Sequence, residues 1–220
     1  TELAAGDFSL FETMLWSKGY LWLREHMERM ASSASALGFP WNWAEAAGCL
    51  EKVEEGLRVS GGRFKVRFTL SRDGSFGSDC EPVEHSLSLS PLRLCLAGDR
   101  VDSSNPLVKH KTTERGLYDR YFAAAMQKGF GEVLFRNERG ELCEGAISSL
   151  FIRRGIRFST PPLSSGLLPG VYRRYFLATR PSAAEKTLTL QDLHDADMIY
   201  IGNSVRGLRP AIFTGDEISA

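Results

Sequence analysis

Residues 64–70 carry the clearest hydrophobic pattern in the chain. Large apolar side chains (Phe, Val, Phe and Leu) alternate there with Lys, Arg and Thr. A period of two predicts a β-strand with one buried face, which is typical of antiparallel sheets. Asp73 and Gly74 follow closely, and this pair predicts a hairpin turn.

The first 40 residues predict a strand followed by a helix. The apolar run at residues 8–16 predicts the strand, with a turn at 17–19 and a partner strand at 20–23. In residues 24–37 apolar side chains recur at helical spacing, and Gly38 is suited to end that helix.

Beyond residue 40, short apolar runs alternate with turn residues, and Asn42 is a residue type that caps helices. We expect helices at residues 42–55, 113–128 and 170–179, and strands at 86–90, 92–96, 131–136, 141–144, 147–153, 156–159, 198–201 and 208–213.

This order of elements is neither a regular βαβ alternation nor a repeat, and it predicts an α+β fold in two domains. The polar segment at residues 102–106 ends in proline and is the best candidate for a linker. We therefore expect a small N-terminal domain at residues 1–102, a linker at 103–108 and a larger C-terminal domain at 109–220, with a cleft between the domains.

Composition narrows the class of protein. With 220 residues, 43% of them hydrophobic, the chain can bury a sizeable core. Its 27 basic and 27 acidic residues balance, which argues against nucleic-acid binding by bulk charge. No apolar run approaches the roughly 18 residues of a membrane span. The four cysteines have no metal-site spacing, so we expect free thiols in a reducing cytoplasm and no metal.

Five short motifs carry the candidate chemistry. Together they supply an amine for a Schiff base, a carboxylate, a helix start that can bind phosphate, and cationic side chains. These are the parts that a protein needs to hold pyridoxal phosphate. In chain order the motifs are REHMER at 24–29, HKTTER at 110–115, EGA at 144–146, LLPG at 167–170 and NSVRG at 203–207.

In their wording and order these motifs resemble those of the class IV aminotransferase family, the fold type IV pyridoxal-phosphate enzymes. The resemblance covers the chain from residue 8 to about residue 210. The HKTT-x-R and NSxRG motifs are most similar to the aminodeoxychorismate lyase branch, including the lyase half of aminobenzoate synthase fusions. The resemblance implies a D-amino acid aminotransferase-like fold whose larger C-terminal domain binds the cofactor. It also implies a homodimer.

The resemblance assigns catalytic roles to two residues. Lys111 is the lysine that carries the cofactor, in preference to Lys109, because the family places this lysine four residues before an arginine, here Arg115. Glu144 faces the pyridine nitrogen and keeps it protonated, since a nearby opposite charge stabilises the charged form. Taken singly, without the resemblance, a solvated lysine and a strand-end glutamate in water are the favoured interpretations of these residues.

The same resemblance supplies the other contacts. Phosphate is bound by the Arg29 guanidinium, by amides at a helix start and by a serine hydroxyl. Arg206 is inferred to meet a substrate carboxylate; a surface arginine is the alternative for it and for Arg29. The full set of cofactor contacts is Arg29, Lys111, Glu144, Leu168, Val171, Tyr172, Asn203 and Ser204.

The implied function is a pyridoxal-phosphate lyase that converts 4-amino-4-deoxychorismate into p-aminobenzoate and pyruvate, a step of folate biosynthesis. One alternative is a transaminase, a transferase acting on a branched-chain or D-amino acid through the same Lys111 and Glu144. Another is a domain that binds the cofactor without turnover. Ser149 stands where many family members have asparagine, which leaves the substrate open. A link to an aminodeoxychorismate synthase fits the lyase function, and neither nucleic acid nor membrane is expected as a partner.

Overall fold

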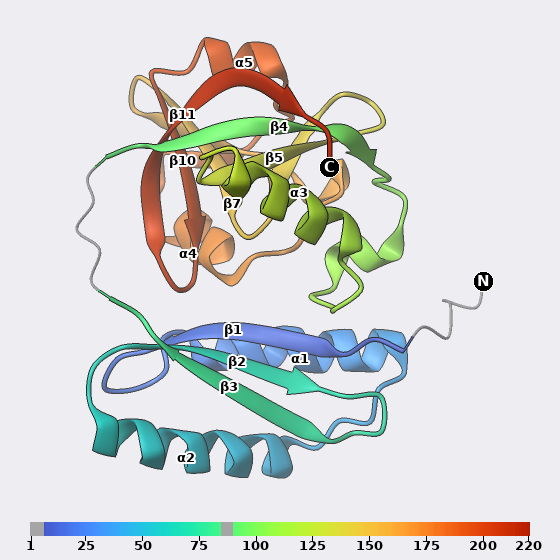
Figure 1. The fold of residues 1–220 in the computed structure, drawn as a ribbon, viewed down its shortest axis with the longest axis vertical. Helices are drawn as coiled ribbons and strands as arrows, with labels where there is room; N and C mark the ends of the chain where they lie inside the picture. Colours follow the sequence, from blue (N-terminus) through green and yellow to red (C-terminus); the bar gives the residue numbers. More distant parts are fainter. Residues whose placement is uncertain (1–6, 85–89) are drawn as a thin grey trace. The chain divides into compact units, whose positions relative to one another are not determined.

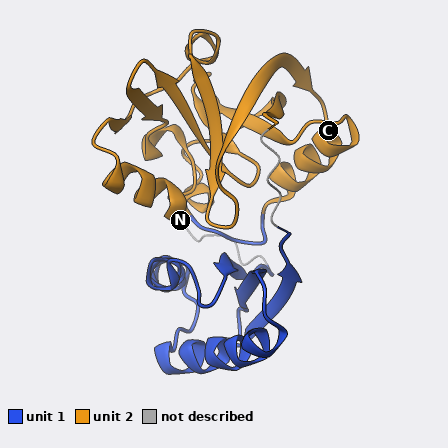
Figure 2. Ribbon diagram, turned by 90° about the vertical axis from the view of Figure 1, so that its left-hand side faces the viewer, with its two compact units in different colours: residues 1–87, 110–114 blue, residues 88–109, 115–220 orange. Residues whose placement is uncertain are grey.

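The computed structural model describes residues 7–84 and 90–220 (Figure 1). The chain divides into two compact units, which Figure 2 shows in different colours. Unit 1 comprises residues 1–87 and 110–114, and unit 2 comprises residues 88–109 and 115–220. The expected strand at 86–90 lies almost entirely outside the described residues.

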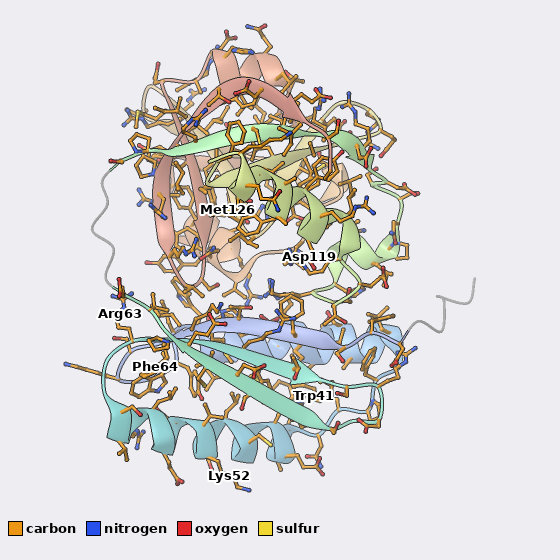
Figure 3. All side chains as sticks on the ribbon, in the orientation of Figure 1. Trp41, Lys52, Arg63, Phe64, Asp119 and Met126 are labelled. Atoms are coloured by element: carbon orange, nitrogen blue, oxygen red, sulfur yellow. The ribbon has the colours of Figure 1, made fainter. Side chains whose placement is uncertain are left out.

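Unit 1 is a three-stranded antiparallel sheet with two helices. The strand order is β1-β2-β3, α1 contacts β1, and α2 contacts β3. Figure 3 shows Lys52 on the side of α2 that points away from the strands. The elements are β1 (Leu10–Trp16), α1 (Leu23–Leu37), α2 (Trp43–Ser60), β2 (Phe64–Leu70) and β3 (Phe76–Pro82).

The hairpin between β2 and β3 follows the predicted alternation. Val66, Phe68 and Leu70 are fully buried, and the residues between them are partly exposed. The Asp73 side chain accepts a hydrogen bond from the Ser75 amide in the turn. The alternation is therefore confirmed as the pattern of a half-buried strand.

The expected strand at residues 20–23 is wrong. Tyr20 forms only an isolated bridge with Trp16, and α1 already begins at Leu23. Lys18 and Trp22 both have positive φ, 63° and 54°. These left-handed conformations turn the chain from β1 directly into the helix, so no length remains for a paired strand.

Both helix ends near residue 40 follow the predicted signals. Gly38 ends α1 in the left-handed conformation, and the Asn42 side chain accepts hydrogen bonds from two amides of the first turn of α2. However, α2 continues to Ser60, five residues beyond the expected end. It stops at Gly61, which has a φ of 65°.

Unit 2 is built on an eight-stranded mixed sheet in the order β6-β5-β4-β11-β10-β7-β8-β9. The central strand β4 pairs in parallel with β5 and β11. The strands are β4 (Leu92–Val101), β5 (Glu132–Asn137), β6 (Leu142–Gly145), β7 (Ser149–Arg154), β8 (Arg157–Thr160), β9 (Ala183–Glu185), β10 (Met198–Asn203) and β11 (Gly207–Ile218). The helices are α3 (Gly116–Gln127), α4 (Val171–Thr179) and α5 (Leu190–His194), with 3-10 helices η1 (Pro106–Lys109) and η2 (Leu163–Ser165).

The middle of this sheet is buried on both faces. Leu94 and Leu134 belong to one hydrophobic cluster, whereas Cys95 and Phe135 belong to another, which also contains Tyr121 of α3. Neighbouring residues of β4 and β5 thus pack on opposite faces, as expected for strands that are nearly continuous apolar runs. The mixture of helices and strands is α+β, as predicted.

The units do not follow the expected domain boundaries of 1–102, 103–108 and 109–220. Residues 92–101 form β4, whose pairing with β5 and β11 places it in unit 2. The expected linker also belongs to unit 2, where the Ser103 hydroxyl and amide donate to the Glu138 carboxylate at 2.7 and 2.9 Å. Residues 110–114 pair with β1 and belong to unit 1.

Three properties bear on the expected class of protein. Within residues 7–84 and 90–220, no helix is both long and apolar enough to cross a membrane. The four cysteines are all free thiols. The described part of the chain holds no group of three or more histidine, cysteine or acidic side chains placed to bind a metal ion.

Candidate functional site

The predicted site residues are divided between the two units. Arg29 and Lys111 belong to unit 1, and the predicted residues from Glu144 to Arg206 belong to unit 2. Each group has a defined geometry within its own unit.

Lys111 lies in a segment that runs beside β1. The Phe11 amide donates to the Lys111 carbonyl at 2.9 Å, and the Thr113 amide donates to the Ser9 carbonyl at 2.9 Å. The Lys111 ammonium lies 4.4 Å from the centre of the Phe11 ring, within the range of a cation–π contact. Pairing with β1 therefore fixes the backbone of this lysine.

Lys109, the other lysine of this motif, has a different setting. It ends η1, belongs to unit 2 and is exposed, whereas Lys111 is partly buried. Between them, His110 lies with Nδ1 2.9 Å from the Ser33 hydroxyl, so this residue is tied to α1. Of the two lysines, Lys111 has the more constrained environment.

Arg29 belongs to a buried ion-pair network between α1 and β1. Its Nε and Nη2 donate to the two carboxylate oxygens of Glu12 at 2.7 and 2.5 Å, and His26 Nδ1 lies 2.7 Å from the same carboxylate. Burial raises the pKa of Glu12, but the charge of Arg29 and the hydrogen bonds from His26 and Arg29 outweigh it and bring this pKa to about 2. The carboxylate thus holds the guanidinium in one orientation.

Glu144, on β6, is a buried carboxylate held by two neighbours. The Leu168 amide donates to its Oε1 at 3.2 Å, and the Tyr118 hydroxyl donates to the same oxygen at 3.4 Å. The structure therefore brings two of the predicted cofactor contacts, Glu144 and Leu168, together. Burial and the negative charge of Glu144 raise the pKa of Tyr118, which keeps this hydroxyl protonated as a donor.

Tyr118 was not among the predicted site residues. The sequence gives it only as one position in the helical pattern of α3, 26 residues before Glu144. No local motif contains both positions, so the hydrogen bond between Tyr118 and Glu144 could be found only from the structure.

The start of α4 packs against the end of β10. A Cβ added at Gly202 would lie 2.6 Å from a ring carbon of Tyr172, so the absence of a side chain there permits the contact. Gly170 precedes α4, and no side chain among the described residues caps that helix. The first-turn amides of Val171 and Tyr172 are therefore held near the strand that leads to Ser204.

The loop after β10 is shaped by Asn203. Its Oδ1 accepts from the amides of Val205 and Arg206 at 3.1 and 2.9 Å, and its Nδ2 donates to the Ile147 carbonyl at 3.2 Å. Ser204 is buried and Arg206 is exposed. The Asn203 side chain thus orders the loop that contains Ser204 and Arg206.

Ser149, the departure from the family pattern, lies under the start of α4. It begins β7 and pairs with Gly202 of β10. A Cβ added at Gly170 would lie 2.9 Å from the Ser149 hydroxyl oxygen. Small residues at these three positions therefore let β7, β10 and α4 approach closely.

Comparison with known proteins gives consistent matches over most of the chain. The family model for amino-transferase class IV matches residues 9–212. A Schizosaccharomyces pombe protein named "Putative aminodeoxychorismate lyase" is 28% identical over 212 residues, which cover 91% of this chain and 87% of that protein. A "Putative branched-chain-amino-acid aminotransferase" of Methanocaldococcus jannaschii is 26% identical, covering 86% and 72%.

A solved structure extends the likeness to the fold. The crystal structure of a "Putative amino-acid aminotransferase" from Mesorhizobium loti is 36% identical in sequence and superposes with a TM-score of 0.88. The match covers 94% of this chain and all of that one. The chain therefore belongs to the class IV amino-transferase family.

Proposed function

We propose that this protein is a pyridoxal-phosphate lyase that converts 4-amino-4-deoxychorismate into p-aminobenzoate and pyruvate. The buried Glu144 carboxylate, held by the Leu168 amide and the Tyr118 hydroxyl, is the observation that carries the cofactor assignment. The HKTT-x-R and NSxRG motifs and the name of the Schizosaccharomyces pombe relative support the choice of reaction.

The donors that are present fit the phosphate of this cofactor. The start of α4 offers the amides of Val171 and Tyr172, and no described side chain caps that helix, which suits an anion there. Ser204 adds a hydroxyl and Arg29 adds a guanidinium. The proposal assigns these residues of both units to one cofactor.

The residues near the proposed ring are given distinct tasks. When bound, the cofactor supplies an electron-accepting ring. The Leu168 amide orients the Glu144 carboxylate, which would keep a proton on the ring nitrogen, and the Leu168 side chain would pack against the ring. Asn203 holds the loop in which Ser204 contacts phosphate.

The reaction needs two proton movements. The Lys111 amine would hold the cofactor and, when free, would take the proton from the amine-bearing carbon of the substrate. A proton is then delivered to the enolpyruvyl methylene, pyruvate leaves, and the ring of the product becomes aromatic. Arg206 binds a substrate carboxylate, for which a guanidinium is well suited.

A transaminase is the second candidate. It is favoured by the 36% identity to the Mesorhizobium loti protein and by the Methanocaldococcus jannaschii relative. A transaminase leaves pyridoxamine phosphate when it meets an amino-acid donor without a keto acid, whereas the lyase regenerates pyridoxal phosphate at each turnover. The absorption spectrum of the loaded protein, recorded with branched-chain and D-amino acids, separates the two.

We also propose that the protein is a cytoplasmic homodimer and that it associates with an aminodeoxychorismate synthase.

The cofactor lysine can be identified chemically. Borohydride reduction of the loaded protein is expected to fix the cofactor on Lys111, and peptide mass spectrometry locates it. Lys111→Ala is expected to abolish the labelled peptide, because no other amine would occupy the attachment position. Lys109→Ala is the matched control and is expected to keep the label, and a wild-type label on Lys109 would overturn the assignment.

A further inference from the structure

Glu132, the first residue of β5, is a buried carboxylate that the proposed reaction does not use. Its exposed fraction is 0%. Among the described residues it has no cationic partner, although burying an unpaired carboxylate carries a high free-energy cost. Its charge must be stabilised by dipoles instead.

Four hydrogen bonds to Glu132 provide that stabilisation. Oε1 accepts from the amides of Val133 and Ala146, both at 3.0 Å. Oε2 accepts from the Ile147 amide at 3.3 Å and from the Ser148 hydroxyl at 2.6 Å. Three of the four donors therefore belong to one turn, residues 145–148, which directly follows Glu144.

The pattern of donors fits an ionised carboxylate. Burial raises the pKa of Glu132, and the hydrogen bonds from Ser148 and from the backbone amides oppose that rise. The three amides can only donate, so a protonated carboxyl group would have only the Ser148 hydroxyl as an acceptor.

The packing requires glycine at the start of this turn. A Cβ added at Gly145 would lie 2.8 Å from the Glu132 carboxylate carbon and 2.7 Å from the Ser148 hydroxyl oxygen. The Gly145 amide also donates to the Ser148 carbonyl at 2.7 Å. The turn is therefore closed around the carboxylate.

The turn at 145–148 also binds two other segments of unit 2 through its carbonyl groups. Arg115 Nη2 donates to the Ala146 carbonyl at 2.8 Å, and Asn203 Nδ2 donates to the Ile147 carbonyl at 3.2 Å. Arg115 follows Lys111 by four residues in the sequence, and Asn203 directly precedes Ser204.

We infer that Glu132 is a positioning residue: its carboxylate fixes the turn at 145–148, and through that turn it sets Glu144, Arg115 and the Asn203–Ser204 loop. The consequence for catalysis rests on the proposed function. The role of Glu132 in fixing the turn is independent of the proposed function, and it can be measured in the protein without cofactor.

The first test is amide hydrogen exchange in Glu132→Gln. Glutamine keeps the size of the side chain but turns one acceptor oxygen into an NH₂ donor. The Ser148 hydroxyl can reverse to accept from it, but the Ile147 amide then loses its acceptor. Because a lost buried hydrogen bond weakens protection by about tenfold or more, exchange at Ile147 is expected to accelerate by that factor, whereas the Ala146 amide keeps Oε1 and the Val133 carbonyl as acceptors.

Two further variants separate positioning from general destabilisation. Glu217→Gln removes a unit 2 carboxylate that pairs with Arg136, away from the turn, and is expected to leave exchange at Ala146 and Ile147 unchanged. Ser148→Ala removes one of the four donors and is expected to accelerate exchange at Ile147 by a smaller factor. It also tests the inference if Glu132→Gln fails to fold. Unchanged exchange at the turn, or equal acceleration throughout unit 2, would overturn the inference.

The second test uses the loaded protein. Glu132→Gln is expected to lower kcat at least tenfold with a smaller change in KM, because misplaced groups act after the substrate binds. A wild-type protein without turnover, combined with fast exchange in the variant, would refute the proposed function and leave the positioning role standing. Normal turnover in Glu132→Gln would refute the positioning of Glu144.

Discussion

At the scale of single residues, two buried carboxylates are stabilised in different ways. Glu12 is held by a guanidinium and an imidazole, whereas Glu132 is held by three amides and a hydroxyl. The first arrangement lowers the pKa of its carboxyl group to about 2, and burial dominates in the second and raises the pKa. The two residues therefore respond differently to acid.

Glu12 makes stability depend on pH. Its folded pKa of about 2 lies below the ordinary 4.5, so its contribution to the free energy of unfolding is complete above about pH 4.5 and is lost as pH falls through about 2. Glu12→Gln removes this contribution, roughly 3 kcal/mol at neutral pH from about 1.4 kcal/mol per pKa unit.

Urea unfolding between pH 7 and pH 3 measures this effect. The difference in unfolding free energy between wild type and Glu12→Gln is expected to shrink as the pH falls. Glu81→Gln, which removes an exposed partner of Lys65 in the same unit, is expected to change stability far less, because solvent screens exposed ion pairs. A difference of constant size across this pH range would show that Glu12 does not carry a lowered pKa.

The candidate site residues could be predicted from short sequence motifs, but the side chains that orient them could not. Lys111, Glu144 and Ser204 lie in short contiguous motifs. Glu12 lies 17 residues from Arg29, and Tyr118 lies 26 residues from Glu144. Such pairs form only when separate elements pack together, so no local spacing in the sequence predicts them.

At the scale of elements, α4, whose first turn carries two of the proposed phosphate donors, packs closely against β10. The Tyr172 ring lies over Gly202, and Ser149 lies beneath Gly170. These contacts depend on the small residues at positions 149, 170 and 202. A single added methyl group therefore tests the arrangement.

Gly202→Ala is expected to destabilise the protein by about 1–3 kcal/mol, because the new Cβ would lie 2.6 Å from the Tyr172 ring. It is also expected to weaken cofactor binding, since α4 must shift away from β10. Gly116→Ala is the matched control: nothing lies within 4 Å of the added Cβ, and alanine favours the helix. Thermal unfolding and cofactor titration measure both effects; a Gly202→Ala protein as stable as wild type would refute the close contact.

Long or strongly patterned elements were predictable, whereas β9 and α5 were not. The alternation of β2 and the spacing of α1 each repeat over several residues, so the signal accumulates. The three-residue strand β9 and the five-residue helix α5 are too short to show a period. Their positions depend on pairing with β8 and on packing of Leu193 in the core of unit 2.

At the scale of the whole molecule, the chain passes between its two units more than once. Residues 88–109 lie in unit 2, residues 110–114 return to unit 1, and the chain then continues in unit 2. The returning segment carries Lys111 and pairs with β1, about 100 residues earlier in the chain. Composition placed the linker at 103–108 because that segment is polar, but strand pairing determined the units.

The central claim is that Lys111 and Glu144 serve a pyridoxal-phosphate lyase. The most direct measurement mixes the cofactor-loaded protein with 4-amino-4-deoxychorismate, without a keto acid, and quantifies p-aminobenzoate and pyruvate. Equal amounts of both products over many turnovers are expected, with Lys111→Ala inactive and Lys109→Ala active. No p-aminobenzoate from a fully loaded wild-type protein, together with pyridoxamine phosphate formation from an amino acid, would contradict the lyase and establish a transaminase.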